Sequence, residues 1–467
     1  MAERSGRLVS PEQMEEQRMY MAQVHAMAQR PRSFHVVTYG CQMNAHDSEY
    51  LAGMLREMGM DEAPDRAHAD FVLFNTCCVR DNAERRALGN VTWLKELRKQ
   101  NPRLMIGVCG CMIQQPGMAE RILQQYRFVD LAFGTANLYR LPEMMLHALT
   151  SDRAVVEVEE QDVIPENMPV KRLRQDAAYI TIMYGCDNFC SYCVVPYVRG
   201  RERSREMDAI LREAEALQQS GVKEIMLLGQ NVNSYGKGLS HGESFAQLLR
   251  RLDSLGIERI RFMTSHPKDL SDELIDVMGT SRHVLPQFHL PVQSGNDEIL
   301  RRMNRHYDRA RYLDRVDALR RTVPGIGLTT DIIVAFPGET EAEYQQTRAF
   351  IEEIGFARIH VFPFSPREGT KAAQMIGQLS REEKERRARA LIALGEEVSL
   401  RYRQGWLNRE AQVLLEEPDS QGGWLGYTPE YIQVTVPACP ACCQGAVLPV
   451  RLTAMTGDGM AGELLPA

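Results

Sequence analysis

Three cysteines in the middle of the chain have a spacing that suits a soft-metal centre. Cys186, Cys190 and Cys193 follow a C-x3-C-x2-C pattern and come directly after the apolar run 179–183, which predicts a β-strand. Their thiolates can therefore converge on one centre in a short loop. A 4Fe-4S cluster normally takes four thiolates, so a cluster held by three leaves one iron open to a substrate or cosubstrate. Such an open position is useful for chemistry and useless to a pure electron carrier.

Two other interpretations of these cysteines are open. Structural zinc closes its tetrahedron with paired halves such as C-x2-C or H-x3-5-H, and no second half lies nearby in the sequence. A reduced set of cysteines that binds nothing is the other alternative. The spacing favours an iron-sulfur cluster over both.

A second group of cysteines lies in the first third of the chain, where short apolar runs alternate with helical patterns. This alternation predicts βαβ units and a parallel sheet. In such sheets ligands bind beyond the carboxyl ends of the strands. Three of the strand ends could therefore bring three thiolates to one point, although the spacing does not decide between neighbouring cysteines. The runs are 34–38, 71–74, 104–108 and 128–133, and the cysteines that follow three of them are Cys41, Cys77 with Cys78, and Cys109 with Cys111.

The composition is that of a globular chain without a membrane span. At 467 residues the chain predicts about three domains, and 44% hydrophobic with 25% charged residues is typical of such proteins. No run of about 18 apolar residues is present, and the polar N-terminus lacks the apolar core of a signal peptide. Eleven cysteines without a secretion signal indicate a reducing compartment and metal ligands rather than disulfides. A cytoplasmic location is therefore expected.

The formal net charge of −7 does not by itself indicate a nucleic-acid partner, but local basic patches matter more than the total. Each patch could also be a solvated helix face interlaced with acids. One patch lies beside the central cysteines and the other lies near residue 305. They consist of Arg199, Arg201, Arg203 and Arg205, and of Arg301, Arg302, Arg305, Arg309, Arg311 and Arg315.

The rest of the chain predicts two further β-containing regions. Six strand-helix units fit an incomplete α/β barrel, with its site at the carboxyl ends of the strands. Beyond Trp406, about five short strands in some 60 residues predict a small antiparallel barrel. The expected strands of the large barrel are 179–183, 224–228, 259–263, 287–290, 327–334 and 358–362, and those of the small one are 411–415, 424–427, 431–436, 446–452 and 462–465.

The fold class expected is α/β: a Rossmann-like parallel-sheet domain, a partial (β/α)6 barrel and a small β-barrel. Ser10 as cap, Pro11 at the first helical position and Gln13 closing a capping box predict a short helix near the N-terminus. The expected segments are this polar helical extension, the parallel-sheet domain, a linker, the barrel core and the small β domain, at residues 1–32, 33–150, 151–171, 172–402 and 405–467.

The central cysteine motif, with an aromatic residue before its last cysteine, resembles the signature of the radical S-adenosylmethionine (SAM) enzymes. The continuation 193–205 is narrower and resembles the methylthiotransferases, most closely the branch that acts on tRNA. Three N-terminal stretches are similar to that family's motifs: Gly40-Cys41-Gln-Met-Asn44, Asn75-Thr-Cys77-Cys-Val-Arg80 and Gly110-Cys111-Met-Ile-Gln114.

The resemblance implies two 4Fe-4S clusters per chain. It assigns the first to Cys186, Cys190 and Cys193, where the open iron holds SAM, and the second to Cys41, Cys77 and Cys111. Cys78 and Cys109 are then core residues, and Asn44, Arg80 and Gln114 lie around the second cluster. The resemblance also implies SAM contacts from the barrel mouth and tRNA contacts from the first arginine patch. The implied SAM contacts are Gln230, Asn231, Ser265, Gln293, Ser294 and Asp331, with His266 as either a turn residue or a catalytic one.

The activity that the resemblance implies is methylthiolation of C2 of N6-(dimethylallyl)adenosine at position 37 of tRNA, next to the anticodon. A radical made from SAM removes the hydrogen, since general bases do not ionise an aromatic C–H at neutral pH. The second cluster handles the inserted sulfur, and another SAM gives the methyl group. The implied partners are tRNA with an isopentenylated adenosine and an electron donor such as flavodoxin or ferredoxin. A monomer is expected, and the sulfur donor is not predicted.

Two alternative functions are kept. One is methylthiolation of an aspartate in ribosomal protein S12, within the same family. The other is a non-catalytic iron-sulfur protein that binds RNA. The small C-terminal barrel resembles a TRAM domain, but it departs from a phosphate-binding surface because it holds seven acidic residues against Arg409 and Arg451. It also contains the unexpected motif Cys439-Pro-Ala-Cys442-Cys443, which is at most half a zinc site.

Overall fold

The computed structural model describes residues 7–78, 81–151, 153–158 and 163–466, so the expectation for Arg80 lies outside the described residues. The chain forms two compact units. The first holds residues 1–173, 183–187 and 193–205, and the second holds 174–182, 188–192 and 206–467. Among the described residues, no helix combines the length and the apolar composition that crossing a bilayer requires.

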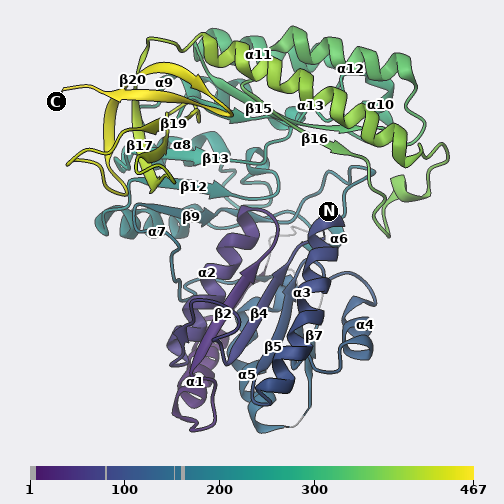
Figure 1. Ribbon diagram of the computed structural model, residues 1–467, viewed down its shortest axis with the longest axis vertical. Coiled ribbons are helices and arrows are strands. Elements are labelled where there is room, and N and C mark those ends of the chain that lie inside the picture. The colour runs from purple at the N-terminus through teal and green to yellow at the C-terminus, as the bar shows by residue number, and fades with distance from the viewer. Residues whose placement is uncertain (1–6, 79–80, 152, 159–162, 467) are drawn as a thin grey trace. The chain divides into compact units, whose positions relative to one another are not determined.

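The first unit is built on a six-stranded parallel sheet (Figure 1). The expected strands at residues 34–38, 71–74, 104–108 and 128–133 are all present, and α-helices connect them as the rhythm predicted. The strand order is β3 (Asp61–Glu62), β2 (Ser33–Thr38), β4 (Phe71–Thr76), β5 (Met105–Gly110), β6 (Leu131–Phe133) and β7 (Val155–Glu157). The helices are α1 (Pro11–Ala26), α2 (Gln42–Glu57), α3 (Asp81–Gln100), α4 (Met118–Gln125) and α5 (Leu141–Thr150), with a short 3-10 turn η1 (Thr135–Arg140) before α5.

Both faces of this sheet are covered, which explains the continuous apolar runs in its central strands. Phe71 and Leu73 of β4 pack into a core with α1, α2 and α5, whereas Val72 and Phe74 pack into a second core with α3 and α4. Successive side chains of a strand point to opposite faces, so a strand covered on both sides is apolar at every position.

Two short strands lie within the predicted linker 151–171. Its residues 155–157 form β7, which pairs parallel with β6 at the edge of the sheet, and β8 (Val163–Ile164) pairs parallel with β1 (Arg7–Leu8). The N-terminal helix begins at Pro11 with the predicted capping box between Ser10 and Gln13. Met21 and Val24 of that helix belong to the core of the sheet, so the helix is packed rather than free.

The second unit contains the predicted incomplete barrel of six parallel strands (Figure 1). Two three-stranded sheets are joined by a bridge between Ile260 and Val284. The strands are β9 (Ala177–Thr181), β12 (Glu224–Leu228), β13 (Arg259–Phe262), β14 (Gln287–His289), β15 (Gly327–Val334) and β16 (Arg358–Pro363). The helices that follow them include α7 (Met207–Gln219), α8 (Phe245–Ser254), α9 (Asp272–Thr280), α10 (Asp297–Arg302), α11 (Arg309–Thr322), α12 (Glu341–Ile354) and α13 (Arg381–Gln404).

The expected strand 179–183 is divided in the structure. Its first part is β9, whereas β10 (Met183–Tyr184) pairs antiparallel with β11 (Arg203–Ser204) in the first unit. The short helix α6 (Val195–Val198) lies between the cysteine motif and β11.

The C-terminal region is a closed five-stranded barrel, as expected. One detail of the prediction is wrong, because β19 and β21 pair in parallel while the other neighbours pair antiparallel. Its core contains Val413, Leu415, Val434 and Val450. The strand order is β17 (Glu410–Pro418), β18 (Trp424–Tyr427), β19 (Gln433–Val436), β21 (Gly459–Leu464) and β20 (Val447–Thr456).

This small barrel is anchored on the large one by buried charges. Glu224, the first residue of β12, accepts hydrogen bonds from Arg259 (2.8 Å) and Arg261 (3.0 Å) of β13. Arg261 also donates to the carbonyl oxygens of Thr428 (2.8 Å) and Pro429 (2.9 Å) in the loop between β18 and β19. The small barrel therefore packs at the amino ends of these strands, opposite the end where the site was predicted.

Candidate active site

The N-terminal cysteines lie where three neighbouring strands end. Cys41 caps α2 after β2, Cys77 follows β4, and Cys111 follows β5. Asn44 lies at the centre of the group, since its Oδ1 is 3.9 Å from Cys41 Sγ and 3.8 Å from Cys111 Sγ. Its Nδ2 donates to the carbonyl oxygens of Tyr39 and Thr76, both at 2.9 Å, so the amide is fixed from both sides.

Glycine is required beside this group. Gly40 has φ +120°, and a Cβ there would lie 2.7 Å from Cys77 Cβ and 3.0 Å from Cys77 Sγ. Gly110 has φ +97°, and a Cβ would lie 2.5 Å from the carbonyl oxygen of Thr76. Only glycine adopts this backbone readily and leaves room for the approach of the strand ends. The glycine before Cys41 and the one before Cys111 are thus part of how the thiols are brought together.

Cys78 and Cys109 are fully buried, as expected of core residues. Burial raises the pKa of the Cys109 thiol, which keeps it protonated. The Cys78 thiol hydrogen-bonds Cys111, and this contact, helped by the Arg199 guanidinium, lowers the pKa of Cys111 to about 6. Cys111 is therefore prepared to be a thiolate, which is the form that binds iron.

Arg199 occupies a position that charge patterning did not indicate. Its side chain is buried, and it donates to Cys111 Sγ (3.3 Å), Asn44 Oδ1 (2.9 Å) and Asp47 Oδ2 (2.6 Å). Asp47 is also buried, so the guanidinium is paired within the protein. Arg199 was predicted to contact tRNA, and in the structure its buried side chain faces the N-terminal cysteines.

Two other members of the predicted RNA-binding patch are also buried. Arg203 donates to the carbonyl oxygens of Val163 (3.1 Å) and Arg199 (2.9 Å). Arg205 makes a two-pronged ion pair with Glu166, at 2.7 and 2.6 Å. Arg201 is the half-exposed exception, and it pairs with Asp187 at 2.6 and 3.0 Å. Three of the four arginines predicted to contact tRNA are therefore buried and paired within the protein, and Arg201 is about half exposed.

The segment 188–191 of the central cysteine loop is held by residues just after α10. Asn304 Nδ2 donates to the carbonyl oxygen of Phe189 at 3.0 Å, and the Ser191 amide donates to that of Met303 at 3.0 Å. Phe189 has φ +44°, in the left-handed region that non-glycine residues rarely adopt. This clamp fixes the backbone on both sides of Cys190, whose side chain is buried.

Arg305 is the counterpart of Arg199 at this second set of cysteines. Its Nη1 lies 3.3 Å from Cys190 Sγ, and its Nη2 donates to the carbonyl oxygen of Pro291 at 2.8 Å. The side chain is buried, and its Nε donates to Tyr307 Oη at 2.9 Å. Sequence reasoning missed this role and placed Arg305 in a basic patch.

Several predicted SAM contacts lie at the carboxyl ends of the barrel strands. Ser265 Oγ and Gln293 Oε1 are buried and, among the described residues, have no hydrogen-bond partner. Gln293 has φ +69°, a strained conformation for a residue with a side chain. Buried polar atoms without partners are rare in proteins, and a bound polar cosubstrate would satisfy them. These atoms therefore fit a ligand such as SAM.

His266 lies at the same mouth and has the turn role that was considered for it. Its Nδ1 accepts from the Lys268 amide at 3.3 Å, so the ring caps the short 3-10 turn η3 (Pro267–Asp269). Burial, and then the nearby Arg305 charge, lower the pKa of His266 far below its usual range, so the ring is neutral. Its Nε2 therefore carries the proton, and in the described part of the chain this atom has no partner.

Comparisons with known proteins agree with this arrangement. Residues 180–351 match the Radical SAM superfamily, and residues 33–134 match the uncharacterized protein family UPF0004. A tRNA-2-methylthio-N(6)-dimethylallyladenosine synthase of Alkaliphilus oremlandii is 48% identical over 421 residues, which cover 90% of this chain and 89% of that protein. The synthase of Caldicellulosiruptor saccharolyticus is 49% identical over 387 residues, 82% of each chain. The chain belongs to this synthase family. It is a radical SAM enzyme of the tRNA methylthiotransferase type, as the resemblance predicted.

A solved structure supports the fold of this family member. The radical S-adenosylmethionine methyltransferase TsrM from Kitasatospora setae matches with a TM-score of 0.54 and 16% identity, over 73% of this chain and 77% of that one. Membership of the Radical SAM superfamily implies a 4Fe-4S cluster and SAM as cofactors. Among the described residues, no three Cys, His, Asp or Glu side chains are arranged to hold a single metal ion.

The remaining predicted SAM contacts differ in their surroundings. Asn231 donates to Asp269 at 2.8 Å, and Asp331 lies 3.5 Å from His289 Nε2 inside the barrel. Gln230, at the end of β12, is half-buried. Ser294 does not fit the expectation, because its fully buried Oγ lies 3.3 Å from Thr347 Oγ1 of α12 and accepts from the Asn296 amide. This side chain holds the loop in place instead of lining the mouth.

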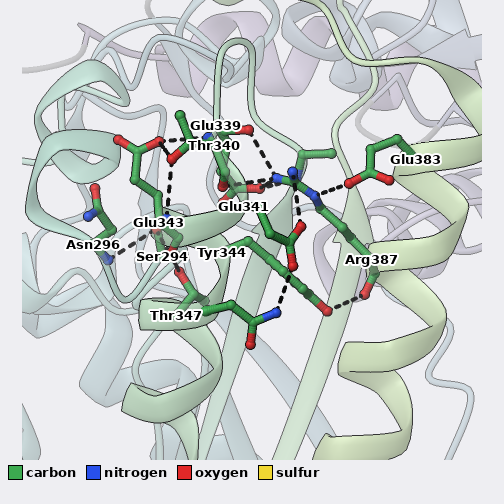
Figure 2. A network of polar contacts seen from close by, with 12 residues as sticks. Ser294, Asn296, Glu339, Thr340, Glu341, Glu343, Tyr344, Thr347, Glu383 and Arg387 are labelled. Atoms are coloured by element: carbon green, nitrogen blue, oxygen red, sulfur yellow. Dashed lines mark hydrogen bonds and ion pairs between the residues drawn. The ribbon is translucent and has the colours of Figure 1, made fainter.

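Figure 2 shows the polar network that fixes the loops after β14 and β15. Glu339 is buried and accepts from the Ala335 amide (2.7 Å) and from Arg387 of α13 (2.9 Å). Ala335 has φ +58°, so the strand ends in a strained turn that this carboxylate stabilises. Arg387 also pairs with Glu383 at 2.6 Å. The Tyr344 hydroxyl of α12 donates to the carbonyl oxygen of Arg387 at 3.0 Å. Thr340 begins α12 with a capping box.

Burial raises the pKa of Glu339 to about 7, even though Arg387 and the Ala335 amide act in the opposite direction. A carboxylate that accepts two hydrogen bonds is usually the charged form. Here the loss of water around the side chain outweighs both contacts. The network that holds the mouth therefore contains a group whose charge changes near neutral pH.

Proposed function

We propose that the protein adds a methylthio group to C2 of N6-(dimethylallyl)adenosine in tRNA, next to the anticodon. The observation that carries the proposal is the convergence of Cys41 and Cys111 on Asn44, with Cys77 against Gly40, in a chain that also has the radical SAM motif. A radical SAM enzyme that used one cluster would not need a second set of three thiols at three strand ends.

Each set of cysteines would hold a 4Fe-4S cluster, which makes two clusters per chain. Cys41, Cys77 and Cys111 would hold one, and Cys186, Cys190 and Cys193 the other. When bound, the second of these clusters supplies the electron that splits SAM and so provides the radical for C–H cleavage. The residues of the mouth bind and orient SAM: the donors and acceptors are Ser265, Gln293 and the Nε2–H of His266.

The chain's own side chains would also control the charge at each cluster. Arg199 and Arg305 donate to Cys111 and Cys190, and N–H···S contacts stabilise the more negative, reduced state of a cluster. The buried Arg199–Asp47 pair holds its guanidinium in place. Water is excluded from the Cys111 side, since Cys78, Val194 and Val198 pack around it.

The proposed partners are tRNA that carries the isopentenylated adenosine, and a one-electron donor such as flavodoxin or ferredoxin. We propose a monomer that works in the cytoplasm. Of the four arginines first assigned to tRNA, Arg201 keeps a side chain that is about half exposed and remains the proposed contact with the RNA backbone.

One observation favours the S12 alternative. Exposed carboxylates lie on the strands and turns of the small barrel and would attract a basic ribosomal protein more readily than RNA. They include Glu410, Glu417, Asp458 and Glu463.

The test uses the full-length protein, reconstituted with iron and sulfide under anaerobic conditions and supplied with SAM and a chemical reductant. The two substrates are tRNA with the isopentenylated adenosine and ribosomal protein S12. We expect the methylthio nucleoside in digested tRNA by mass spectrometry, and no change in the mass of S12. Modified S12 with unmodified tRNA would establish the alternative. Absence of SAM cleavage in protein with full iron content would indicate a non-catalytic iron-sulfur protein.

Two variants separate the roles of the cysteine sets. Cys186→Ala should abolish SAM cleavage, because the cluster that binds SAM is lost. Cys111→Ala should retain SAM cleavage and lose sulfur insertion. Loss of SAM cleavage in both variants would contradict this division of labour.

A further inference from the structure

The loop between β19 and β20 of the small barrel contains three cysteines that the proposed chemistry does not use. Cys439, Cys442 and Cys443 lie within the sequence Cys439-Pro-Ala-Cys442-Cys443, far in the sequence from both cluster motifs. All three are free thiols; Cys443 is exposed, and the other two are partly exposed. The loop is therefore accessible to small molecules and to other proteins.

The backbone of this loop brings Cys439 and Cys442 together. The Cys442 amide donates to the Cys439 carbonyl oxygen at 3.0 Å, which closes a four-residue turn with Pro440 at its second position. Such a turn places its first and last Cα atoms less than about 7 Å apart. Disulfides need Cα atoms about 4.4–6.8 Å apart, so the turn already has a separation that a disulfide can span.

Partial burial, and then the neighbouring Cys439 thiol, raise the pKa of Cys442 to about 11. Cys442 also donates to the Pro437 carbonyl oxygen at 3.7 Å and packs against the core of the barrel. Cys442 is thus held in place, while Cys443 beside it projects into solvent.

We propose that Cys439 and Cys442 form a thiol-disulfide exchange site, closed into a reversible disulfide by a low-molecular-weight or protein disulfide. One cysteine thiolate attacks the disulfide, R–S–S–R, and forms a mixed disulfide while one RS⁻ leaves. The second cysteine loses its proton and attacks the protein sulfur of the mixed disulfide, and the second RS⁻ leaves. The two cysteines are oxidised by two electrons, and the disulfide is reduced to two thiols. A dithiol reverses the reaction.

A metal site is the competing explanation for three close cysteines. Zinc needs a fourth protein ligand in a structural site. In the part of the chain that the structure describes, no group of three or more possible ligands is arranged around a common point here. The turn favours contact between two of the thiols, which is what a disulfide requires and a tetrahedral site does not.

Tryptic digestion isolates the three cysteines of this loop in a single peptide. Trypsin cuts after Arg409 and Arg451 and at no position between them, so all three cysteines fall in one peptide that contains none of the other eight. The full-length protein with its clusters is equilibrated in mixtures of reduced and oxidised dithiothreitol, quenched with acid, alkylated and digested. Mass spectrometry of the peptide then counts alkylated cysteines, independently of any enzymatic activity.

We expect the peptide to pass from three alkylated cysteines to one, with a single midpoint, as the mixture becomes more oxidising. Cys439→Ser and Cys442→Ser should prevent this change, whereas Cys443→Ser should keep it and leave no alkylated cysteine in the oxidised form. Three alkylated cysteines under all conditions would overturn the proposal. So would a disulfide that persists in Cys439→Ser, or thiols that react only after zinc is removed by a chelator.

Discussion

At the level of single residues, two buried arginines contact the motif cysteines. Arg199 and Arg305 lie far apart in the sequence, yet each places an N–H 3.3 Å from the sulfur of one motif cysteine, Cys111 and Cys190 respectively. Hydrogen bonds to cluster sulfurs are one of the means by which proteins set reduction potentials. The charge patterning of the sequence gave the opposite impression, because it could not show that both side chains are directed inward.

Replacing Arg305 should lower the reduction potential of the cluster at Cys190. In Arg305→Gln a charged donor to sulfur is lost, so the reduced cluster is stabilised less. A loss of about 1.4 kcal/mol of that stabilisation lowers the one-electron reduction potential by about 60 mV. Arg301→Gln is the matched control, since Arg301 is 73% exposed and pairs with Glu298 on the same segment. A redox titration followed by electron paramagnetic resonance should show the shift in the first variant alone. Equal potentials in both variants would contradict this role.

The neighbouring cysteines Cys77 and Cys78 should behave differently on replacement. Cys77→Ala should lose the iron of the N-terminal cluster, about half of the total, because one of three thiolates is gone. Cys78→Ala should keep its iron, since that side chain packs with Val194 and Val198 as a core residue. Iron analysis of both purified proteins is the measurement. Loss of iron in Cys78→Ala with retention in Cys77→Ala would reverse the assignment.

At the level of elements, the loops of the barrel mouth depend on α12 and α13. Ser294 and Thr347 tie the loop after β14 to α12, and Glu339 with Arg387 ties the turn after β15 to α13 (Figure 2). The loop that carries two of the predicted SAM contacts, Gln293 and Ser294, and the turn after β15 are thus held by side chains of α12 and α13.

Removing Arg387 should destabilise the protein. Arg387→Ala leaves Glu339 buried without its partner, which typically costs about 3–5 kcal/mol. Arg386→Ala is the control on the same helix, because Arg386 is about half exposed and ion pairs in water contribute little to stability. Chemical unfolding of the two anaerobic holoproteins should show a much larger loss for Arg387→Ala. Similar losses for both would contradict the importance of the buried pair.

The raised pKa of Glu339 predicts a pH dependence of stability. The folded protein, with a pKa of about 7 at this group, binds more protons than the unfolded chain, whose value is 4.5. The stability linked to this group is therefore fully present below pH 4.5 and is lost as the pH rises through 7. The difference is on the order of 3 kcal/mol.

Glu339→Gln should make the free energy of unfolding depend less on pH between about 5 and 7. The glutamine amide keeps an oxygen for the Ala335 N–H and does not titrate. Denaturant unfolding of both holoproteins at several pH values from about 5 to 7 is the measurement. An unchanged slope in the variant would show that the pH dependence arises elsewhere.

Element patterns predicted much of the fold for a physical reason. A strand covered on both faces must be apolar throughout, so β4 and β5 were evident, and the capping box of Ser10 and Gln13 marked a helix start. The pairing of β7 with the sheet and the parallel contact between β19 and β21 could not be predicted, because the partner of a short strand is decided by tertiary packing.

The site was predictable only in part, for a similar reason. The central cysteines were singled out by their C-x3-C-x2-C spacing, whereas spacing alone did not decide between the neighbouring cysteines at the strand ends. The partners of Arg199 and Arg205 were not found, because Asp47 and Glu166 are 152 and 39 residues away in the sequence.

At the level of the whole molecule, the chain combines a sheet unit that gathers three thiols with a barrel unit whose mouth has polar atoms in need of a ligand. In the second unit the small barrel is fixed at the amino ends of β12 and β13 through Glu224, Arg259 and Arg261. The small barrel and the mouth therefore lie at opposite ends of the strands of the large barrel.

The most direct test of the account is the iron and sulfide content of anaerobically reconstituted protein. Two clusters require about eight irons per chain, falling to about four in a variant with Cys41, Cys77 and Cys111 replaced by alanine, while SAM cleavage continues. About four irons in the unaltered protein, with no loss in the triple variant, would contradict the claim that the N-terminal thiols hold a cluster of their own.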